Sequence, residues 1–187
     1  MIVIEPEKIV TLRSPVASDG PSITRLIRNC PPLDENSIYC NLLQCTHFAE
    51  TSVVGEFGGE LVASATGYLV PAREDILFIW QVAVSEKARG HALGRRMLDY
   101  LLSRPACAAV TYLETTVTED NGASWSMFER FADRLGAQVR RATFFDKSLH
   151  FGGTHETEIL ARIGPLQGAR KTMPEQQIAA FKQESKA

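Results

Sequence analysis

The spacing of apolar residues changes period along the chain, and each change marks a predicted element. A short strand is expected over 9–13. Apolar residues at helical spacing follow a helix-start signal at 18–21 and predict a first helix, which Pro31 ends because proline cannot continue a helix. Polar residues at 34–37 are suitable caps for a second helix that carries Ile38. The first quarter of the chain therefore reads as one strand and two helices.

Three strands are predicted next. Those over 52–57 and 60–69 flank Gly58-Gly59, a two-residue hairpin turn. The third, over 77–84, is the most apolar stretch of the chain and follows a polar connection at 71–75. This run predicts a hairpin joined to a buried strand.

Helical and extended patterns then alternate to the end of the folded part. Helices are predicted from Leu93 to Leu102, before Arg104-Pro105, and over 124–135, before Gly136. Strands are predicted over 112–118, 138–145 and 155–163. We detect no internal repeat. The order predicts an α/β (α+β) fold, in which one mixed, twisted sheet is flanked by helices. We expect one domain over 1–165 and a polar, flexible tail over 166–187.

Composition narrows the class of protein. The net charge of -2 gives no electrostatic footprint for nucleic acid. No apolar run approaches the roughly 18 residues that a membrane span needs, and residues 1–10 do not resemble a signal peptide. The four cysteines form no CxxC pair and have no histidine at zinc-ligand spacing, so we expect free thiols and no metal. These features predict a cytoplasmic protein with no membrane or nucleic-acid partner.

The segment 82–94 holds the sharpest local signal. It runs from a buried strand through a short loop and a small-residue turn into a helix, with Arg89 and Arg95 nearby. Unpaired N–H groups at a helix start suit a diphosphate, and small residues let it approach closely. The alternative is a plain strand-to-helix connection. The turn is neither GxGxxG nor a P-loop, so a Rossmann or P-loop site is not supported.

The run Arg89-Gly90-His91-Ala92-Leu93-Gly94 resembles the pyrophosphate motif of the GNAT acetyltransferases, Arg/Gln-x-x-Gly-x-Gly/Ala. It departs from the motif at Ala92, where glycine is usual. The resemblance implies the GNAT fold, acetyl-CoA as cosubstrate and, as in many enzymes of this fold, a homodimer. The residues that it implies for cofactor binding are Val82, Ala83, Val84, Arg89, Gly90, His91, Ala92, Gly94, Arg95 and Asn121.

Four longer segments carry a closer resemblance. Residues 31–43, 46–52, 78–84 and 113–118 together are similar to the L-2,4-diaminobutyrate acetyltransferases of ectoine biosynthesis, a family within the GNAT enzymes. That resemblance implies acetylation of the γ-amine of L-2,4-diaminobutyrate, a small-molecule substrate. The alternatives are another small amine, a peptide or protein amine, and a CoA-binding protein without activity.

Acetyl transfer to an amine makes demands that acidic side chains meet. The ammonium must be held and deprotonated before it attacks, because free aliphatic amines are mostly protonated at pH 7. Asp34 is the first candidate for an ammonium ligand, with a helix cap as the alternative. Glu158, Glu114 and His155 are candidate catalytic residues. The alternative for Glu158 is a solvent-facing strand residue, and for Glu114 a solvated or salt-bridged sheet residue. For His155 it is a surface or capped histidine.

Further candidates surround these acids. Trp80 is predicted to pack against the acceptor or, alternatively, in the core. Gln81 lies in an apolar strand, where its amide must find partners. Asn36 and Tyr39 lie close to Asp34 and are predicted to complete the acceptor pocket, or else to be helix-surface residues.

One departure from the GNAT pattern concerns the proton donor to the CoA thiolate. Many of these enzymes use a tyrosine at the position where this chain has Phe128, which cannot donate a proton. Water, another hydroxyl such as that of Tyr39, or the departing ammonium remain as donors.

Overall fold

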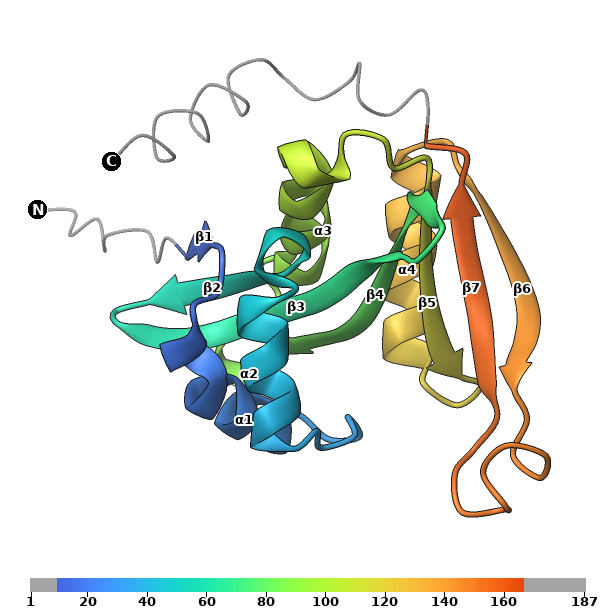
Figure 1. The fold of residues 1–187 in the computed structure, drawn as a ribbon, viewed down its shortest axis with the longest axis horizontal. Coiled ribbons are helices and arrows are strands. Elements are labelled where there is room, and N and C mark those ends of the chain that lie inside the picture. Colours follow the sequence, from blue (N-terminus) through green and yellow to red (C-terminus); the bar gives the residue numbers. More distant parts are fainter. Residues whose placement is uncertain (1–9, 167–187) are drawn as a thin grey trace, which may run out of the picture. The chain divides into compact units, whose positions relative to one another are not determined.

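The described part of the computed structural model, residues 10–166, contains seven strands and four α-helices (Figure 1). The strands hydrogen-bond in the order β1-β2-β3-β4-β5-β7-β6. Strands β4 and β5 run parallel, whereas the pairs β1–β2, β2–β3, β5–β7 and β6–β7 are antiparallel. The predicted mixed sheet with helices is therefore confirmed. The strands are β1 Thr11–Arg13, β2 Val53–Phe57, β3 Glu60–Val70, β4 Arg73–Val84, β5 Tyr112–Thr118, β6 Gln138–Phe145 and β7 Glu158–Gly164. The helices are α1 Gly20–Arg28, α2 Ile38–Thr46, α3 Leu93–Ser103 and α4 Gly122–Arg134.

Two strands, β4 and β7, start three or more residues away from the predicted position. β4 begins at Arg73 rather than at 77, because the turn that precedes it is only Pro71-Ala72, with Ala72 at a φ of 62°. Arg73 and Asp75 then project from one face of the strand and pair at 3.0 Å, so polar residues extend it into solvent. β7 begins at Glu158 rather than at 155, because residues 146–157 form a loop that is held by its own hydrogen bonds.

The chain forms two compact units that share strand β4. The first comprises residues up to Tyr68 together with Gln81–Leu101. Its core joins α1, α2, β2 and the end of β4 through Ile23, Leu26, Ile27, Cys30, Cys45, Val54 and Ala83. Gly58 and Gly59 have φ of +57° and +80°, which the tight β2–β3 hairpin requires and glycine adopts freely.

The second unit comprises Leu69–Trp80 and the residues from Leu102 onward. Helix α4 packs against β6 and buries Trp125, Phe128 and Phe131, the last of which the helical spacing alone did not single out. Arg141 of β6 lies over the Trp125 ring at 3.8 Å and pairs with Glu129 of α4. These contacts fix the helix on its strand.

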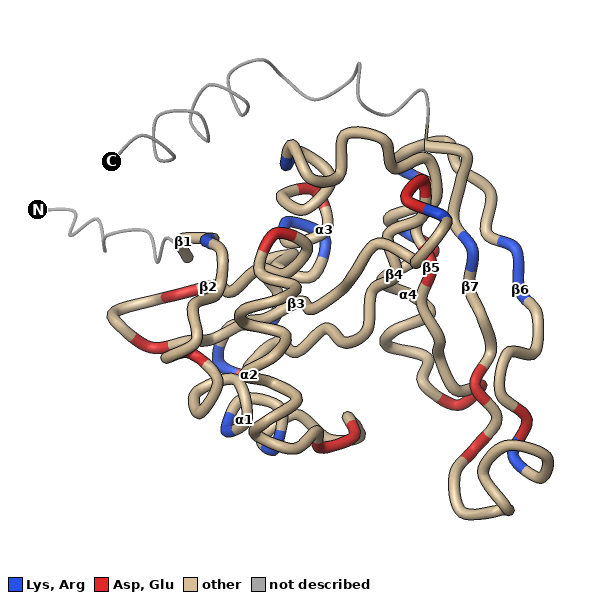
Figure 2. The backbone as a smooth tube through the Cα atoms, in the orientation of Figure 1, with Lys and Arg blue, Asp and Glu red and all other residues tan. Residues whose placement is uncertain are grey.

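Charged residues are distributed along both units. Figure 2 shows basic and acidic positions interspersed along the described chain. All four cysteines are free, with three buried and Cys40 half-buried, as predicted. Within 10–166, no helix is long and apolar enough to cross a membrane. The predicted tail, 166–187, lies outside the described residues from 167 onward, so the boundary at 165 and the flexibility of the tail stay predictions.

Candidate functional site

The turn into α3 has the backbone geometry of an anion-binding loop. Gly90 and Ala92 adopt φ of 85° and 52°, and both residues are exposed. Leu93 and Gly94 are buried at the start of the helix, whose first N–H groups have no acceptor within it. Arg89, His91 and Arg95 are exposed around the turn. This arrangement can hold a diphosphate, although Ala92 carries backbone strain that glycine at this position would not.

The cysteines of the first unit do not have the properties of nucleophiles. Burial raises the pKa of the Cys30, Cys40 and Cys45 thiols, to about 11 for Cys45. Cys30 lies beside strand β4, with its Sγ 3.5 Å from the carbonyl oxygen of Val84. An acyl-cysteine route needs a thiolate at neutral pH, so this chemistry does not suit these three residues.

Three of the predicted acceptor residues form one hydrogen-bonded group in the first unit. The Asn36 Nδ2 donates to Gln81 Oε1 at 3.1 Å, and the Gln81 Nε2 donates to the backbone oxygen of Asp34 at 2.9 Å. The hydrogen-bond partners that were expected for the Gln81 amide thus lie in the loop before α2. The Asp34 side chain lies on the exposed side of that loop.

The capping alternative for Asp34 is wrong. The N-cap of α2 is Ser37, whose hydroxyl accepts a hydrogen bond from the Cys40 N–H at 3.1 Å. The Asp34 carboxylate is therefore not used as the cap of α2. Tyr39, in the first turn, is 67% exposed, which leaves its hydroxyl accessible to a ligand.

The core-packing alternative for Trp80 is also wrong. Its side chain is 44% exposed, whereas Ile79 on the opposite face of β4 is fully buried. Val82 and Val84 alternate along β4 on the same face as Trp80 and are half-buried, while Ala83, on the other face, is buried. From its apolar sequence, β4 was expected to be buried. In the structure one of its faces is accessible, and a ligand can lie along that face.

In the second unit, His155 and Glu158 face one another at the start of β7. The His155 Nε2 lies 3.8 Å from Glu158 Oε1, and both side chains are mostly buried. The other ring nitrogen, Nδ1, lies 2.7 Å from the backbone oxygen of Glu156, which only accepts, so Nδ1 carries the proton of this contact. In the neutral ring Nε2 is then an acceptor that faces a carboxylate. Two acceptors in this arrangement suit a shared proton or an ammonium group.

The ring of His155 is held by a residue that sequence reasoning missed. Phe151 lies against it with ring centroids 4.6 Å apart, and Phe145 lies 6.1 Å from Phe151. These contacts come from the loop 146–157, where Asp146 accepts hydrogen bonds from the N–H groups of Ser148 and Leu149. The aromatic residues near the ends of the two strands are the sequence feature from which this packing could have been predicted.

Glu114 is paired in the sheet. It lies on β5 opposite Arg162 of β7, whose Nε donates to Glu114 Oε1 at 2.5 Å. Glu114 is 6% exposed. This matches the salt-bridged alternative, and an engaged carboxylate oxygen is less suited to activate a water. Its predicted role as a base stays a prediction that the geometry disfavours.

The last candidates lie on α4. Asn121 is the N-cap, with its Oδ1 accepting from the Ser124 N–H at 3.1 Å, so its amide NH₂ remains the group for a ligand contact. Phe128 is buried, as a packing residue would be. Across residues 10–166, no group of three His, Cys, Asp or Glu side chains could hold a metal ion.

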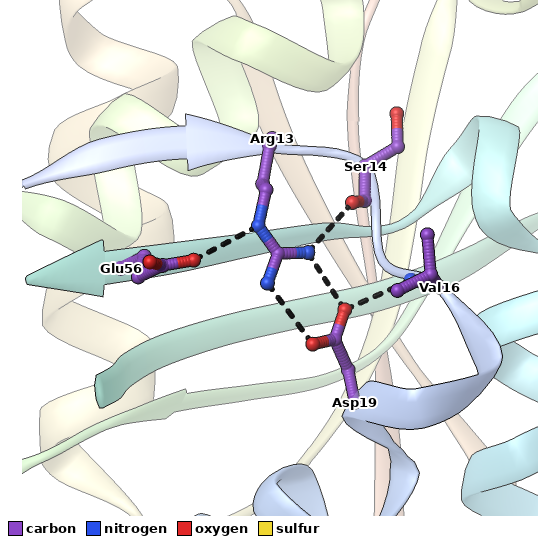
Figure 3. A network of polar contacts seen from close by, with 5 residues as sticks. All are labelled: Arg13, Ser14, Val16, Asp19 and Glu56. Atoms are coloured by element: carbon purple, nitrogen blue, oxygen red, sulfur yellow. Dashed lines mark hydrogen bonds and ion pairs between the residues drawn. The ribbon is translucent and has the colours of Figure 1, made fainter. Parts of the chain in front are cut away.

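A further polar network lies in the first unit, and the sequence did not reveal it (Figure 3). Arg13 donates to both carboxylate oxygens of Asp19, at 2.7 and 3.0 Å, and to Glu56 at 3.0 Å. The Val16 N–H also donates to Asp19. The guanidinium holds the pKa of Asp19 below its usual value. Because these three side chains hydrogen-bond to one another, the network holds β1 against β2 and the start of α1 rather than binding a ligand.

Comparisons with known proteins agree with this geometry. Residues 21–132 match the model of the acetyltransferase (GNAT) family. The chain is 50% identical to the L-2,4-diaminobutyric acid acetyltransferase of Methylotuvimicrobium alcaliphilum, over 87% of this chain and 94% of that one. It is 48% identical to the enzyme of that name from Vibrio parahaemolyticus, over 87% and 90%. The diaminobutyrate acetyltransferase EctA from Paenibacillus lautus, solved with L-2,4-diaminobutyric acid and coenzyme A, superimposes with a TM-score of 0.82 at 34% identity, covering 85% of this chain and 96% of that one.

Proposed function

The chain belongs to the acetyltransferase (GNAT) family, and on this basis we propose that it transfers the acetyl group of acetyl-CoA to the γ-amine of L-2,4-diaminobutyrate. The product is N-γ-acetyl-diaminobutyrate, the precursor for ectoine synthesis. The observation that carries the proposal is the 50% identity to a diaminobutyric acid acetyltransferase over nearly the full length of both chains. The fold, the enzyme class and the cosubstrate follow from the same relationship.

The accessible face of β4 and the turn into α3 are the proposed acetyl-CoA site. The exposed arginines and first N–H groups of α3 suit the pyrophosphate, and the backbone of Val82 and Val84 suits the pantetheine arm. In the second unit, the amide NH₂ of Asn121 is a further proposed contact for the cosubstrate.

Acidic groups in each unit are the proposed acceptor ligands. In the first unit, Asp34 is the proposed ligand of one substrate ammonium, with the exposed Tyr39 close to it in the chain. In the second unit, the exposed Trp80 is a further proposed substrate contact. Glu158, supported by His155, takes a proton from the γ-ammonium. The neutral nitrogen then attacks the thioester carbon and becomes positively charged in the tetrahedral intermediate. It loses its second proton as the C–S bond breaks, and the thiolate takes a proton. Phe128 cannot supply this proton, so it comes from water, from a hydroxyl such as that of Tyr39, or from the departing ammonium.

Steady-state release of free CoA thiol tests the proposal. The purified chain is assayed with acetyl-CoA and L-2,4-diaminobutyrate, ornithine, lysine or no amine. We expect saturable turnover confined to diaminobutyrate, and a product whose acetyl group NMR places on the γ-nitrogen. Turnover of ornithine or lysine at equal kcat/KM would reassign the substrate. CoA binding without turnover on any amine would identify a binding protein.

We further propose that the enzyme is a cytoplasmic homodimer. Three buried free thiols and one half-buried thiol suit a reducing compartment. The edge strand β6 exposes Phe144 and Phe145, each 42% exposed, which a second subunit would cover. Sedimentation equilibrium and fractionation of cells that express the chain test the two parts separately.

A further inference from the structure

Gln81 connects the acceptor loop to strand β4 through both ends of its amide. Its NH₂ donates to the backbone oxygen of Asp34 at 2.9 Å, and its oxygen accepts from the Asn36 side chain at 3.1 Å. The two contacts span 47 and 45 residues of sequence. All three residues lie in the first unit. A single side chain thus holds two points of the loop 34–36.

Only one orientation of the Gln81 amide satisfies both contacts. If the amide were flipped, its NH₂ would face the NH₂ of Asn36, and its oxygen would face the carbonyl oxygen of Asp34. Donor would then meet donor and acceptor would meet acceptor. The loop position therefore depends on the amide being in this orientation, and no carboxylate or hydrocarbon side chain reproduces it.

Two further contacts of the loop do not involve Gln81. Arg28 pairs with Glu35 at 3.1 Å, but both side chains are more than half exposed, so this pair contributes little. The Leu33 N–H donates to the Cys30 carbonyl at 3.1 Å, which anchors the start of the loop. Within the loop, Gln81 contacts the backbone of Asp34 and the side chain of Asn36 directly.

Gln81 also sits next in sequence to Val82, whose backbone belongs to the proposed acetyl-CoA strand. The same residue therefore fixes the acceptor loop to the strand that presents the cosubstrate. Both of its amide ends are engaged by protein groups, which argues against a direct substrate contact.

From this geometry we infer that Gln81 is a positioning residue, which holds Asp34 in place for the substrate ammonium. This inference rests on the proposed function, because it takes Asp34 as an ammonium ligand. Displacing a binding group by about 1 Å can cost on the order of 100-fold in rate, so the loss of both contacts is expected to be large relative to the two hydrogen bonds themselves.

The test combines Gln81→Met, which keeps the length and removes both contacts, with Asp34→Asn. In the wild-type background we expect Gln81→Met to lower kcat/KM for diaminobutyrate by about 10- to 100-fold. The change should fall mainly on KM for the amine, with the Kd for CoA within about twofold of wild type. In the Asp34→Asn background the same substitution should cost less than about threefold, because residues that act through one another are not additive. Gln138→Met, on the exposed edge strand β6, is the matched control and should behave as wild type.

Two results would overturn the inference. Equal losses in the two backgrounds would show that Gln81 acts on the substrate independently of Asp34, and unchanged kinetics would show that its contacts have no functional role. Asn36→Ala removes one of the two contacts from a half-buried loop residue, and serves if Gln81→Met does not fold.

A readout independent of turnover separates this inference from the proposed function. Amide hydrogen exchange over 33–37 in the free protein should be faster in Gln81→Met than in wild type. Unchanged exchange would refute the positioning role. A wild-type protein without turnover on diaminobutyrate would instead refute the proposed function.

Discussion

Glu114 and Arg162 are direct partners across strands β5 and β7, with the Arg162 Nε 2.5 Å from Glu114 Oε1. The carboxylate is almost fully buried, whereas the guanidinium is 40% exposed. Such a pair holds two strands in register. This catalytic candidate thus has a structural role in the sheet, and its role as a base stays a prediction.

Replacing Glu114 should affect stability more than chemistry. Glu114→Gln keeps an oxygen for Arg162 but removes the charge, which should lower the free energy of unfolding by about 1–2 kcal/mol. We expect kcat to stay within about threefold of wild type. Urea unfolding and the thiol-release assay measure the two effects, and a loss in kcat above 100-fold with normal stability would restore Glu114 as the base.

Glu158 should show the opposite behaviour. Glu158→Gln should lower kcat by about 10²- to 10⁴-fold, the range for loss of a general base, with little change in CoA affinity. His155→Asn should have a smaller effect in the same direction, since the ring supports Glu158 at 3.8 Å. The matched control is Glu156→Gln, which changes an exposed acid of the same loop, paired with Lys147 at 2.6 Å. Near-normal kcat in Glu158→Gln would remove it from the mechanism.

The backbone of the turn into α3 can be tested without changing any charge. Gly90→Ala places a Cβ in open space but at a φ of +85°, so it should cost about 1–2 kcal/mol of backbone strain and weaken CoA binding. Ala92→Gly relieves a left-handed alanine at φ 52° and should retain or improve CoA affinity.

Ala72→Gly is the control for these substitutions, because Ala72 is also left-handed, at φ 62°, but lies in the β3–β4 turn. It should leave the Kd for CoA unchanged. Isothermal titration with CoA measures all three variants. Equal CoA affinity in Gly90→Ala and wild type would show that the turn does not hold the pyrophosphate.

Acid stability should depend on Asp19. Its pKa is lowered chiefly by the hydrogen bonds from Arg13, so its stabilisation is fully present above the unfolded pKa of about 3.9 and is lost as the pH falls through the folded-state value. Asp19→Asn should lower the free energy of unfolding by about 1–3 kcal/mol at pH 7. In this variant the free energy of unfolding should also fall less steeply than in wild type as the pH drops below about 4.

Asp75→Asn is the comparison for Asp19. The pKa of Asp75 is also lowered, by Arg73, but the pair is exposed, so the effect on unfolding at either pH should be much smaller. Urea titrations at pH 7 and pH 3.5 measure both variants. Equal effects of the two substitutions would contradict the importance of the Arg13 network.

The sequence by itself determined the order of elements, the position of the glycine turn before α3 and the family. These features are local or nearly so: helical spacing in 93–102, alternation and β-branching in 112–118, and the glycine pair at 58–59 each restrict a few neighbouring residues. The predicted bounds of β5 and β6 agree with the structure for this reason. Motif residues such as Gly90 and Gly94 are likewise read from one short segment.

Only the tertiary structure decided which side chains meet. The partners of Gln81 and Glu114 lie more than 40 residues away, and strand register and loop path, rather than local pattern, bring them together. The exposure of Trp80 was also decided there, because an apolar run does not reveal which face of its strand is covered. Ser37 rather than Asp34 caps α2, because the Ser37 hydroxyl accepts the hydrogen bond from the Cys40 N–H. Which of several neighbouring polar residues becomes the cap depends on the backbone geometry.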